Sequence, residues 1–502
     1  MATALPVMDF SPLSTPGRQQ VVTDLLLLDY RRCSRRAYLN LFGDEREREP
    51  ERDFLLKLRQ ESQRHIQTVL QRDYPHYRQP QALREDYQVQ TEETLALMAQ
   101  GTEVIYGGRL SQAFGEVAAT GEKILLVGAP ALLVKQAGHS RWGDWQYRPL
   151  SIHLGRRPKP EYKILAAFYA HLLGHNQGQT PGGADLILRQ GHRFRVDLRE
   201  WLPRFYDALS DYLTTLCEQR EPEVFISRQR CHLCHWQSHC YGLAQSQKHL
   251  SLVPGVTPSR YEALQTLGIQ TLFQLADSAA SPLENLLGPA LAQQLQCQAL
   301  ALVENRPFRR QNTRSFPLPQ APVELYFDIE AEPEQNLDYL LGVLVVEGES
   351  QRFYGFLAET PEQEGEVWRA FLALMAQYPT APIFHFSEYE AETLKRLAKL
   401  YPVPGLDLRR LLGRCYDLHH MVTAQVICPV ENYSLKSLAN WLGFQWRDSA
   451  ASGDQSVCWY DQWSQTRNYS YLERIVQYNE DDCRATWRLK QWLASFLSSQ
   501  GT

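Results

Sequence analysis

The chain has 502 residues, of which 44% are hydrophobic and 22% are charged, and this composition excludes a disordered or fibrous protein. This length accommodates about three domains. The net charge of −5 provides no bulk attraction to nucleic acid, so any such binding must come from local basic patches. There is no long apolar run and no cationic start that leads into an apolar segment. We therefore expect a cytoplasmic protein without a membrane anchor, whose ten cysteines are thiols or metal ligands.

The first half of the chain alternates predicted helices with short strands. A helix is predicted over residues 21–42, with Cys33 near its middle, and a second over residues 54–70. The second helix carries Glu61 and His65 on one face, four residues apart. Strands are then predicted over residues 103–106, 124–127, 132–135 and 146–153, and helices over residues 161–173 and 202–219. This pattern predicts an α/β domain that ends near residue 245.

The strongest local motif is a cysteine group late in this domain, formed by Cys231, Cys234 and Cys240. Two cysteines separated by two residues bring two thiolates to one metal from a tight turn. A fourth ligand is needed, and the chain offers two kinds. The candidates for zinc are His232, His235 and His239, and the candidate for an iron–sulfur cluster is the distant Cys33.

This region resembles the RecB-like nucleases of the PD-(D/E)XK type, in the branch that carries an iron–sulfur cluster. The resemblance is carried by residues 25–38, the helix with Glu61 and His65, the Gly128-Ala-Pro turn, residues 149–162, and the final C-x2-C-x-W-x3-C motif. It implies that a [4Fe–4S] cluster is held by Cys33, Cys231, Cys234 and Cys240, and that this cluster ties the two ends of the domain together.

The same resemblance exposes missing catalytic residues. Ala131 stands where the family has a metal-binding Asp, and Ser151 and His153 stand where it has Asp/Glu-x-Lys. One imidazole, that of His65, cannot assemble a Mg²⁺ site without carboxylates, and without the Lys no cation stabilises the developing charge. We expect the fold to be kept and the catalysis to be lost. Two acids are candidate replacements: Asp144 and Asp185.

Residues 246–305 contain small-residue turns between short helical patterns, as in Leu252-Val-Pro-Gly255. They resemble a helix-hairpin-helix unit, which presents backbone N–H groups at a helix start to a phosphate; an ordinary helical linker domain is the alternative. A linker is predicted over residues 306–322. It contains Arg306, Arg309, Arg310 and Arg314, which either contact phosphates or belong to a solvated tether.

A strand with alternating apolar and polar residues opens the last third of the chain, at Tyr326-Phe-Asp328-Ile-Glu330. Asp328 and Glu330, two residues apart, project side by side from one face. Carboxylates this close raise each other's pKa unless a cation lies between them, and oxygen ligands suit Mg²⁺ or Mn²⁺. Taken alone, the pair also fits an edge strand whose acids face water.

Residues 323–502 read as three antiparallel strands followed by alternating helices and strands, which predicts a ribonuclease H-like α/β fold. The acids resemble those of the DEDD (DnaQ-like) 3′→5′ exonucleases. Asp328 and Glu330 match the first motif, and Tyr478 and Asp482 match the Tyr-x3-Asp motif of the last helix.

The second DEDD motif departs from the family pattern. Glu390 stands where an Asp is usual, and its longer side chain can still reach a metal. Asp417 is a further acid that could serve instead of Glu390 or beside it.

The resemblance therefore implies a multidomain α/β protein similar to a bacterial family of predicted RecB-like nucleases. Its predicted parts are residues 1–245, 246–305, the linker 306–322 and the exonuclease domain 323–502. In that domain two Mg²⁺ or Mn²⁺ ions, about 4 Å apart, bridge the scissile phosphate. The resemblance gives the metal ligands as Asp328, Glu330, Glu390 and Asp482, with Tyr478 orienting the attacking water.

The expected partner is single-stranded DNA or RNA, with a helicase or repair protein as a further candidate. One alternative is a non-enzymatic nucleic-acid-binding or adaptor protein in which both nuclease folds have decayed. Another is that the N-terminal domain is the active nuclease.

Overall fold

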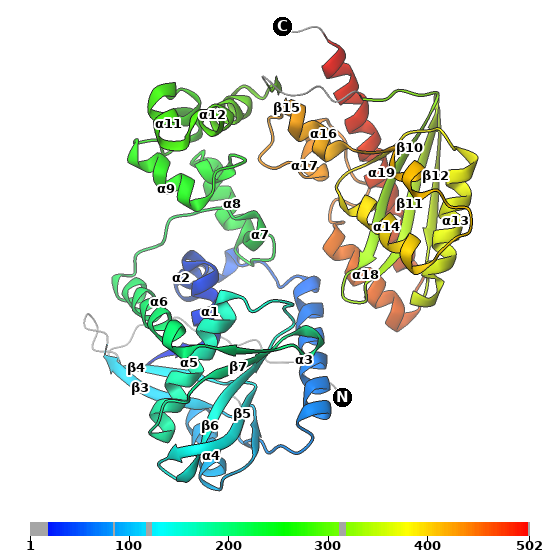
Figure 1. Ribbon diagram of the computed structural model, residues 1–502. Helices are drawn as coiled ribbons and strands as arrows, with labels where there is room; N and C mark the ends of the chain where they lie inside the picture. Colours follow the sequence, from blue (N-terminus) through cyan, green and yellow to red (C-terminus); the bar gives the residue numbers. More distant parts are fainter. Residues whose placement is uncertain (1–18, 84–85, 117–122, 311–317, 500–502) are drawn as a thin grey trace. The chain divides into compact units, whose positions relative to one another are not determined.

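The computed structural model describes residues 19–83, 86–116, 123–310 and 318–499. The chain divides into two compact units, Met1–Tyr241 and Gly242–Thr502. Both contain helices and sheets (Figure 1), so the protein is multidomain and of mixed α/β class, as predicted. Among the described residues, no helix is long and apolar enough to cross a membrane.

The first unit contains two sheets. The three-stranded sheet has the order β1 (Gln19–Thr23), β4 (Lys123–Gly128), β3 (Leu110–Glu116). The five-stranded sheet has the order β2 (Val104–Tyr106), β5 (Leu132–Ser140), β6 (Gly143–Ile152), β7 (Ala184–Ile187), β8 (Arg193–Val196).

Helices pack these sheets into two cores. Helix α5 (Pro160–Gln177) is apolar around most of its circumference and is correspondingly buried. It packs against β6 and α6 (Leu198–Glu218) in the larger core. Helix α3 (Asp53–Asp73) lays an apolar stripe, including Ile66 and Val69, on Ile152 and Ile187. Helix α4 (Tyr87–Ala99) completes the larger core with Met98.

The single helix predicted over residues 21–42 is wrong. Residues 19–23 form β1, because the β-branched residues Val21 and Val22 pair in parallel with β4. The helical part is broken into α1 (Asp24–Arg32) and α2 (Ser34–Phe42) by Cys33, whose backbone is extended at φ −164° and ψ 113°. The break leaves the Cys33 sulfur free to accept a hydrogen bond from the Arg36 N–H, at 3.4 Å.

The second unit begins with a helical region. It comprises α9 (Pro258–Thr266), α10 (Leu272–Ala276), α11 (Ala280–Leu287) and α12 (Pro289–Glu304). The two-residue strand β9 (Phe308–Arg309) then pairs antiparallel with β15 (Val426–Ile427). Gln298 of α12 adds a buried hydrogen bond of 2.8 Å to the carbonyl of Cys428. These contacts attach the helical region to the sheet-containing part of the same unit.

The start of the predicted linker is therefore ordered. The Arg309 guanidinium donates to the backbone carbonyls of Phe496 and Leu497, each at 2.9 Å, near the end of α19 (Ser470–Ser498). A cation at a helix C-terminus complements the helix dipole. Arg310 donates its backbone N–H to Gln425 at 2.9 Å. Arg314 lies outside the described residues.

A five-stranded sheet forms the centre of the second unit (Figure 1). Its order is β12 (Ser350–Leu357), β11 (Leu337–Glu347), β10 (Val323–Glu332), β13 (Ile383–His385), β14 (Cys415–Asp417). The first three strands are antiparallel, and β13 and β14 run parallel to β10. Phe327 and its neighbours on one face pack against α13 (Glu364–Gln377) and α14 (Tyr389–Leu400). Tyr326 and Leu344 on the other face pack against α16 (Leu418–Gln425) and α19.

Helix α19 lies along β10 in the opposite direction. At one end Lys490 forms a buried ion pair with Glu324, and at the other Asn479 donates a hydrogen bond of 2.7 Å to Asp328. These two contacts fix the helix relative to the strand. The long helix predicted in this region and the strand with Asp328 are thus neighbours, although 151 residues separate Asp328 from Asn479.

Candidate metal centre

Three carboxylates meet where α19 crosses β10. One ligand atom from each of Asp328, Glu330 and Asp482 lies within 4.8 Å of the other two. Glu330 is 5% exposed and Asp482 is 9% exposed, so little water reaches them. Of the described residues, only this group of three has the donor spacing of a metal site.

Among the ion pairs of the described residues, none involves these three carboxylates, and the charge of Lys436 is only the last-ranked influence on the pKa of Asp482. Burial, and then the nearby Asp482 carboxylate, raise the pKa values of Asp328 and Glu330 well above their usual range. Burial also raises the pKa of Asp482 to about 7, although hydrogen bonds from Trp446 and Tyr478 oppose that rise. Carboxylates packed this closely are ionised together only when a cation joins them. An all-oxygen donor set suits Mg²⁺ or Mn²⁺, so the residues fit the expected metal.

Neutral donors orient the three acids, and sequence reasoning missed them. Asn479 is fully buried on α19; its side-chain N–H donates to Asp328, and it also hydrogen bonds with Glu330. Trp446 donates its indole N–H to Asp482 Oδ1 at 2.7 Å. One signal was available for Asn479, because it lies three residues before Asp482 and so shares its helix face. Nothing in the sequence distinguished Trp446 from the core tryptophans.

Asn479 fits because the neighbouring strand carries a glycine. Gly342 pairs with Asp328 across β10 and β11. A Cβ atom at Gly342 would lie 1.6 Å from Asn479 Oδ1, which is far inside contact distance.

Glu390 lies in the first turn of α14, just after β13. Its carboxylate accepts a hydrogen bond from Ser387 Oγ at 2.9 Å and lies 3.5 Å from His385 Nδ1. It contributes to the raised pKa of Asp328, after burial and the two nearer acids. Glu390 is thus close to the trio, but its carboxylate is not one of the three within 4.8 Å of each other.

The turn that holds Glu390 is strained. Ser387 has φ +150°, a conformation that costs a non-glycine residue of order 1–3 kcal/mol. Its carbonyl accepts a hydrogen bond from His385 Nδ1 at 2.7 Å, and its hydroxyl also accepts from the Tyr389 N–H at 3.1 Å. Backbone strain of this kind is kept where surrounding contacts over-determine the conformation.

The two remaining predicted residues have different roles. Tyr478 hydrogen bonds with Asp482, and burial followed by the charge of Asp482 raises the tyrosine pKa, so its hydroxyl is a donor. Asp417 accepts the backbone N–H groups of His419 at 2.8 Å and His420 at 3.2 Å and thereby caps α16. Capping accounts for Asp417 without a metal.

The buried acids, the sheet order and the crossing helix have a counterpart among known families. Residues 325–494 match the RNase H superfamily model. The C-terminal part of the chain is therefore an RNase H-like domain, as predicted, and this superfamily match suggests a nuclease-type function. A search of curated proteins finds no match.

In the first unit, the residues expected around a RecB-like catalytic site do not form a cluster of carboxylates. His65 of α3 hydrogen bonds with the backbone of Leu188, and it affects the pKa of His153 at the end of β6. Asp185 is paired with Arg148 at 2.7 Å, and Asp144 is fully exposed. In the described part of this unit, no three candidate ligands share a 4.8 Å neighbourhood.

Four cysteines of the first unit also lie near one another. After burial, the charge of Cys33 raises the pKa values of Cys231, Cys234 and Cys240. The sulfurs of Cys33, Cys231 and Cys234 accept hydrogen bonds from the backbone N–H groups of Arg36, Ser227 and Trp236, and the nearby Arg35 side chain opposes the rise in the pKa of Cys240. No three of these four described sulfurs lie within 4.8 Å of one another.

Proposed function

We propose that the RNase H-like domain is a metal-dependent 3′→5′ exonuclease that acts on single-stranded nucleic acid. The observation that carries this proposal is the close approach of Asp328, Glu330 and Asp482, in which burial and mutual repulsion raise the carboxyl pKa values unless a cation joins them. Tyr478, four residues before Asp482, supports an exonuclease of the DEDD type.

The roles of the side chains follow from their positions. Divalent metal ions bound by these carboxylates would lower the pKa of the attacking water and stabilise charge on the scissile phosphate. Asp328, Glu330 and Asp482 would hold the metal, and Glu390 would supply a further carboxylate from α14. Tyr478 keeps its proton and donates a hydrogen bond, which suits it to orient the water or a phosphate oxygen.

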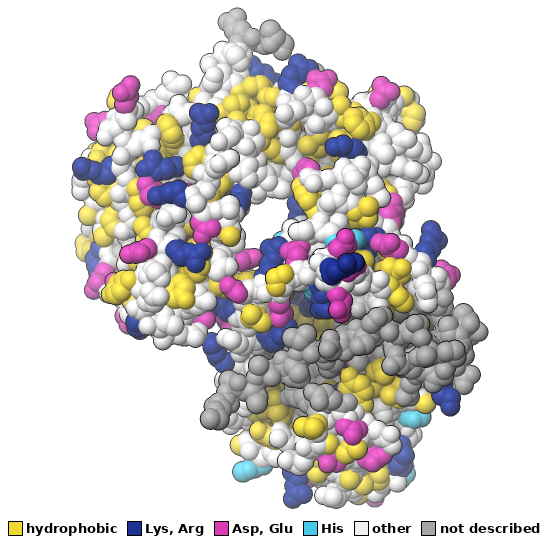
Figure 2. Space-filling model, turned by 180° about the vertical axis from the view of Figure 1, so that it is seen from behind, with side chains coloured by type: hydrophobic (Ala, Val, Ile, Leu, Met, Phe, Trp, Pro, Cys, Tyr) yellow, Lys and Arg dark blue, Asp and Glu magenta, His cyan; other side chains and the backbone are white. Residues whose placement is uncertain are grey.

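Single-stranded substrate agrees with the surface of the protein. On the face in Figure 2, Lys and Arg side chains are interspersed with Asp and Glu. Binding then depends on local contacts such as stacking of bases on aromatic rings. Tyr389 is 47% exposed, precedes Glu390 and is one candidate for such stacking.

The test is degradation of end-labelled single-stranded DNA and RNA in the presence of Mn²⁺. A 5′-label should report a ladder that shortens from the 3′ end, and Asp328→Ala should abolish it. Glu388→Ala is the matched control, because Glu388 is an exposed acid in the turn that leads to Glu390. If the wild-type protein binds single-stranded DNA and RNA but shortens neither, the exonuclease proposal is wrong and a nucleic-acid-binding adaptor function is favoured.

We also propose that the first unit is a RecB-like platform that has lost catalysis. Ala131, Ser151 and His153 in place of metal-binding and catalytic residues support this, as does the pairing of Asp185 with Arg148. Activity that survives Asp328→Ala but is lost in His65→Ala would contradict it and identify the first unit as the nuclease.

Within the second unit, residues 246–305 are proposed as a helix-hairpin-helix contact to the nucleic-acid backbone. Helices α9 and α10 are joined by a turn in which Gly268 has φ +73°, and Thr271 caps α10. Gly268→Ala would strain this turn and should weaken binding of single-stranded DNA in a filter-binding assay.

A [4Fe–4S] cluster is proposed at Cys33, Cys231, Cys234 and Cys240. A single tetrahedral zinc ion, with bonds of about 2.3 Å, needs its sulfur ligands about 3.8 Å apart, whereas no three of these described sulfurs lie within 4.8 Å of one another. Backbone hydrogen bonds to three of the four sulfurs suit an iron–sulfur cluster, whose potential such bonds tune.

The histidines considered as zinc ligands have other partners. His235 bonds with Asn40 at 2.7 Å, and His239 forms an ion pair with Glu47. Purified protein should therefore be brown, with absorbance that dithionite bleaches, and Cys33→Ser should lose this absorbance while Cys297→Ser, in α12, should retain it. A colourless, zinc-loaded protein purified without oxygen would contradict the cluster.

A further inference from the structure

We propose that Arg447 is a positioning residue of the metal centre and that it acts through its neighbour Trp446. The inference rests on the proposed function of the same domain. Trp446 contacts a metal-binding acid directly, whereas Arg447 contacts none of the three, so its effect must pass through the chain.

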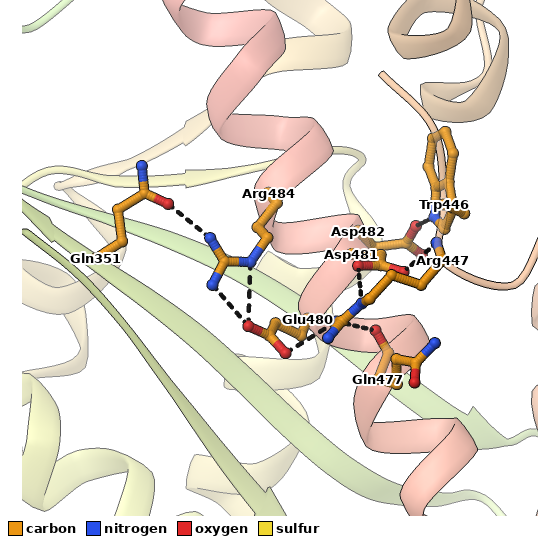
Figure 3. Close-up of polar contacts among 8 residues, drawn as sticks. All are labelled: Gln351, Trp446, Arg447, Gln477, Glu480, Asp481, Asp482 and Arg484. Carbon is orange, nitrogen blue, oxygen red and sulfur yellow. Dashed lines mark hydrogen bonds and ion pairs between the residues drawn. The ribbon is translucent and has the colours of Figure 1, made fainter.

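Arg447 clamps one segment of chain onto α19, as Figure 3 shows. Its backbone N–H donates to Asp481 Oδ2 at 3.0 Å and its Nε to Asp481 Oδ1 at 2.8 Å. Its terminal guanidinium nitrogen donates to the carbonyl of Gln477 at 3.0 Å and to Glu480 Oε2 at 2.9 Å. All these acceptors belong to residues 477–481, the helical turn that leads directly to Asp482.

This clamp fixes the position of the indole. Trp446 belongs to the irregular segment between α17 (Leu435–Trp441) and α18 (Gly453–Thr466), and it is 7% exposed. Later residues of the segment have their own attachments, since Arg474, one turn earlier on α19, bonds Asp448, and Lys436 of α17 bonds the carbonyl of Ser449. In the described structure, the bonds of Arg447 attach the chain next to Trp446 to residues 477–481, which lead directly to Asp482.

The indole in turn determines how Asp482 can bind a cation. Its N–H occupies one lone pair of Oδ1 and fixes the plane of the carboxylate (Figure 3). The remaining lone pairs then face a defined direction, as is usual for carboxylates supported from outside the metal site. Water cannot replace the indole without entering a buried position.

A second arginine separates this role from a simple effect of charge. Arg484 also pairs with Glu480, through bonds of 3.0 and 2.7 Å, and it reaches Gln351 at 2.6 Å. It lies on α19 itself, so its loss removes the same positive charge near Asp482 without releasing the segment of Trp446. Arg484→Ala is therefore the matched control for Arg447→Ala.

The experiment measures Mn²⁺ affinity twice, from the metal-dependent rise in melting temperature and from nuclease activity at graded Mn²⁺. Trp446→Phe and Arg447→Ala should each raise the half-saturating Mn²⁺ concentration about 10- to 100-fold. The double variant should be no worse than either single one, because both act on one contact. Arg447→Lys should recover part of the affinity, and Arg484→Ala should stay near the wild type.

Several results would overturn the proposal. Equal losses in Arg447→Ala and Arg484→Ala would make the effect one of charge, and unchanged Mn²⁺ affinity in Trp446→Phe would remove the indole from the site. A merely structural role lowers the melting temperature without moving Mn²⁺ half-saturation. If the wild-type protein binds Mn²⁺ but degrades no nucleic acid, the exonuclease proposal is wrong, and the role of Arg447 can still be tested by the melting temperature. If Mn²⁺ does not stabilise the wild-type protein, both proposals are wrong.

Discussion

Asn479 donates its side-chain N–H to Asp328 from across the helix–strand interface, at 2.7 Å. The contact joins the first and last motifs of the RNase H-like domain, and Asn479 also bonds Glu330. A neutral hydrogen-bond donor lowers the free-energy cost of placing two ionised carboxylates side by side. It cannot neutralise them as a metal ion would, since it brings no charge of its own. The hydrogen bonds of Asn479 thus offset part of the cost of bringing these carboxylates together, and a cation would offset the rest.

Space for Asn479 depends on Gly342, so Gly342→Ala should damage the centre. The added Cβ would meet Asn479 Oδ1 at 1.6 Å and push the helix turn or its side chain away. We expect a loss of about 1–3 kcal/mol in the free energy of unfolding, typical of overpacking, together with loss of Mn²⁺-dependent activity. Urea denaturation and the strand assay measure these. Gly355→Ala on β12 is the control, since its nearest neighbour is a Phe353 side-chain atom at 3.2 Å; equal damage in both would count against the contact.

Asp328→Asn should stabilise the protein in EDTA. It removes a buried negative charge from a trio in which burial and repulsion raise each pKa, and we expect a gain of about 1 kcal/mol or more. The same variant should lose the rise in melting temperature that Mn²⁺ gives the wild type. Asp338→Asn on the adjacent strand should have the opposite sign, because Asp338 pairs with Arg396 and accepts from Tyr389 at 2.7 Å. If both substitutions destabilise the protein, the hypothesis that Asp328 carries an uncompensated charge is wrong.

Two substitutions of Ser387 separate strain from hydrogen bonding. Ser387→Ala keeps the φ of +150° but removes the hydroxyl from Glu390, whereas Ser387→Gly removes the hydroxyl and relieves the strain. Both should lower activity, because Glu390 loses its 2.9 Å donor. The glycine variant should be the more stable by about 1 kcal/mol or more in thermal denaturation. Full activity in both variants would show that Glu390 needs no support from this turn.

His153 should make the first unit sensitive to acid. Burial, and then the charges of Arg32 and His65, lower its pKa to about 4 from 6.5. Between these values the unfolded chain binds a proton that the folded chain excludes, so stability falls as the pH drops from about 6.5 towards 4. The loss is up to about 3 kcal/mol.

His153→Phe should flatten this dependence, while His139→Phe, at a side chain that is 85% exposed, should not. Melting curves from pH 7 to 4 measure the slope. An unchanged slope in His153→Phe would assign the acid sensitivity to other groups.

The sequence was most informative where chemistry depends on local spacing. The strand with Asp328 and Glu330 and the long helix with Tyr478 and Asp482 were predicted from the sequence. Side chains repeat every two residues on one face of a strand and every 3.6 residues on one face of a helix, so both patterns are visible locally. Trp446 and Asn479 were not identified, because their roles arise only when a loop and a helix meet a distant strand.

The strand at residues 19–23 was missed for a related reason. The apolar pattern there continues into a helix, whereas the extended backbone of residues 19–23 follows from the pairing of β1 with β4, about a hundred residues away in sequence. Tertiary contacts overrode local propensity there.

The pairing of β9 with β15 limits how this chain can be divided. A fragment of the RNase H-like domain that starts at residue 323 would lack Phe308 and Arg309 and leave β15 as an open edge strand. It would also leave the Cys428 carbonyl without its Gln298 donor. Exposed strand edges promote association between molecules. A fragment for expression and crystallisation should therefore begin near Gly242, where the second unit starts, and carry the helical region with it.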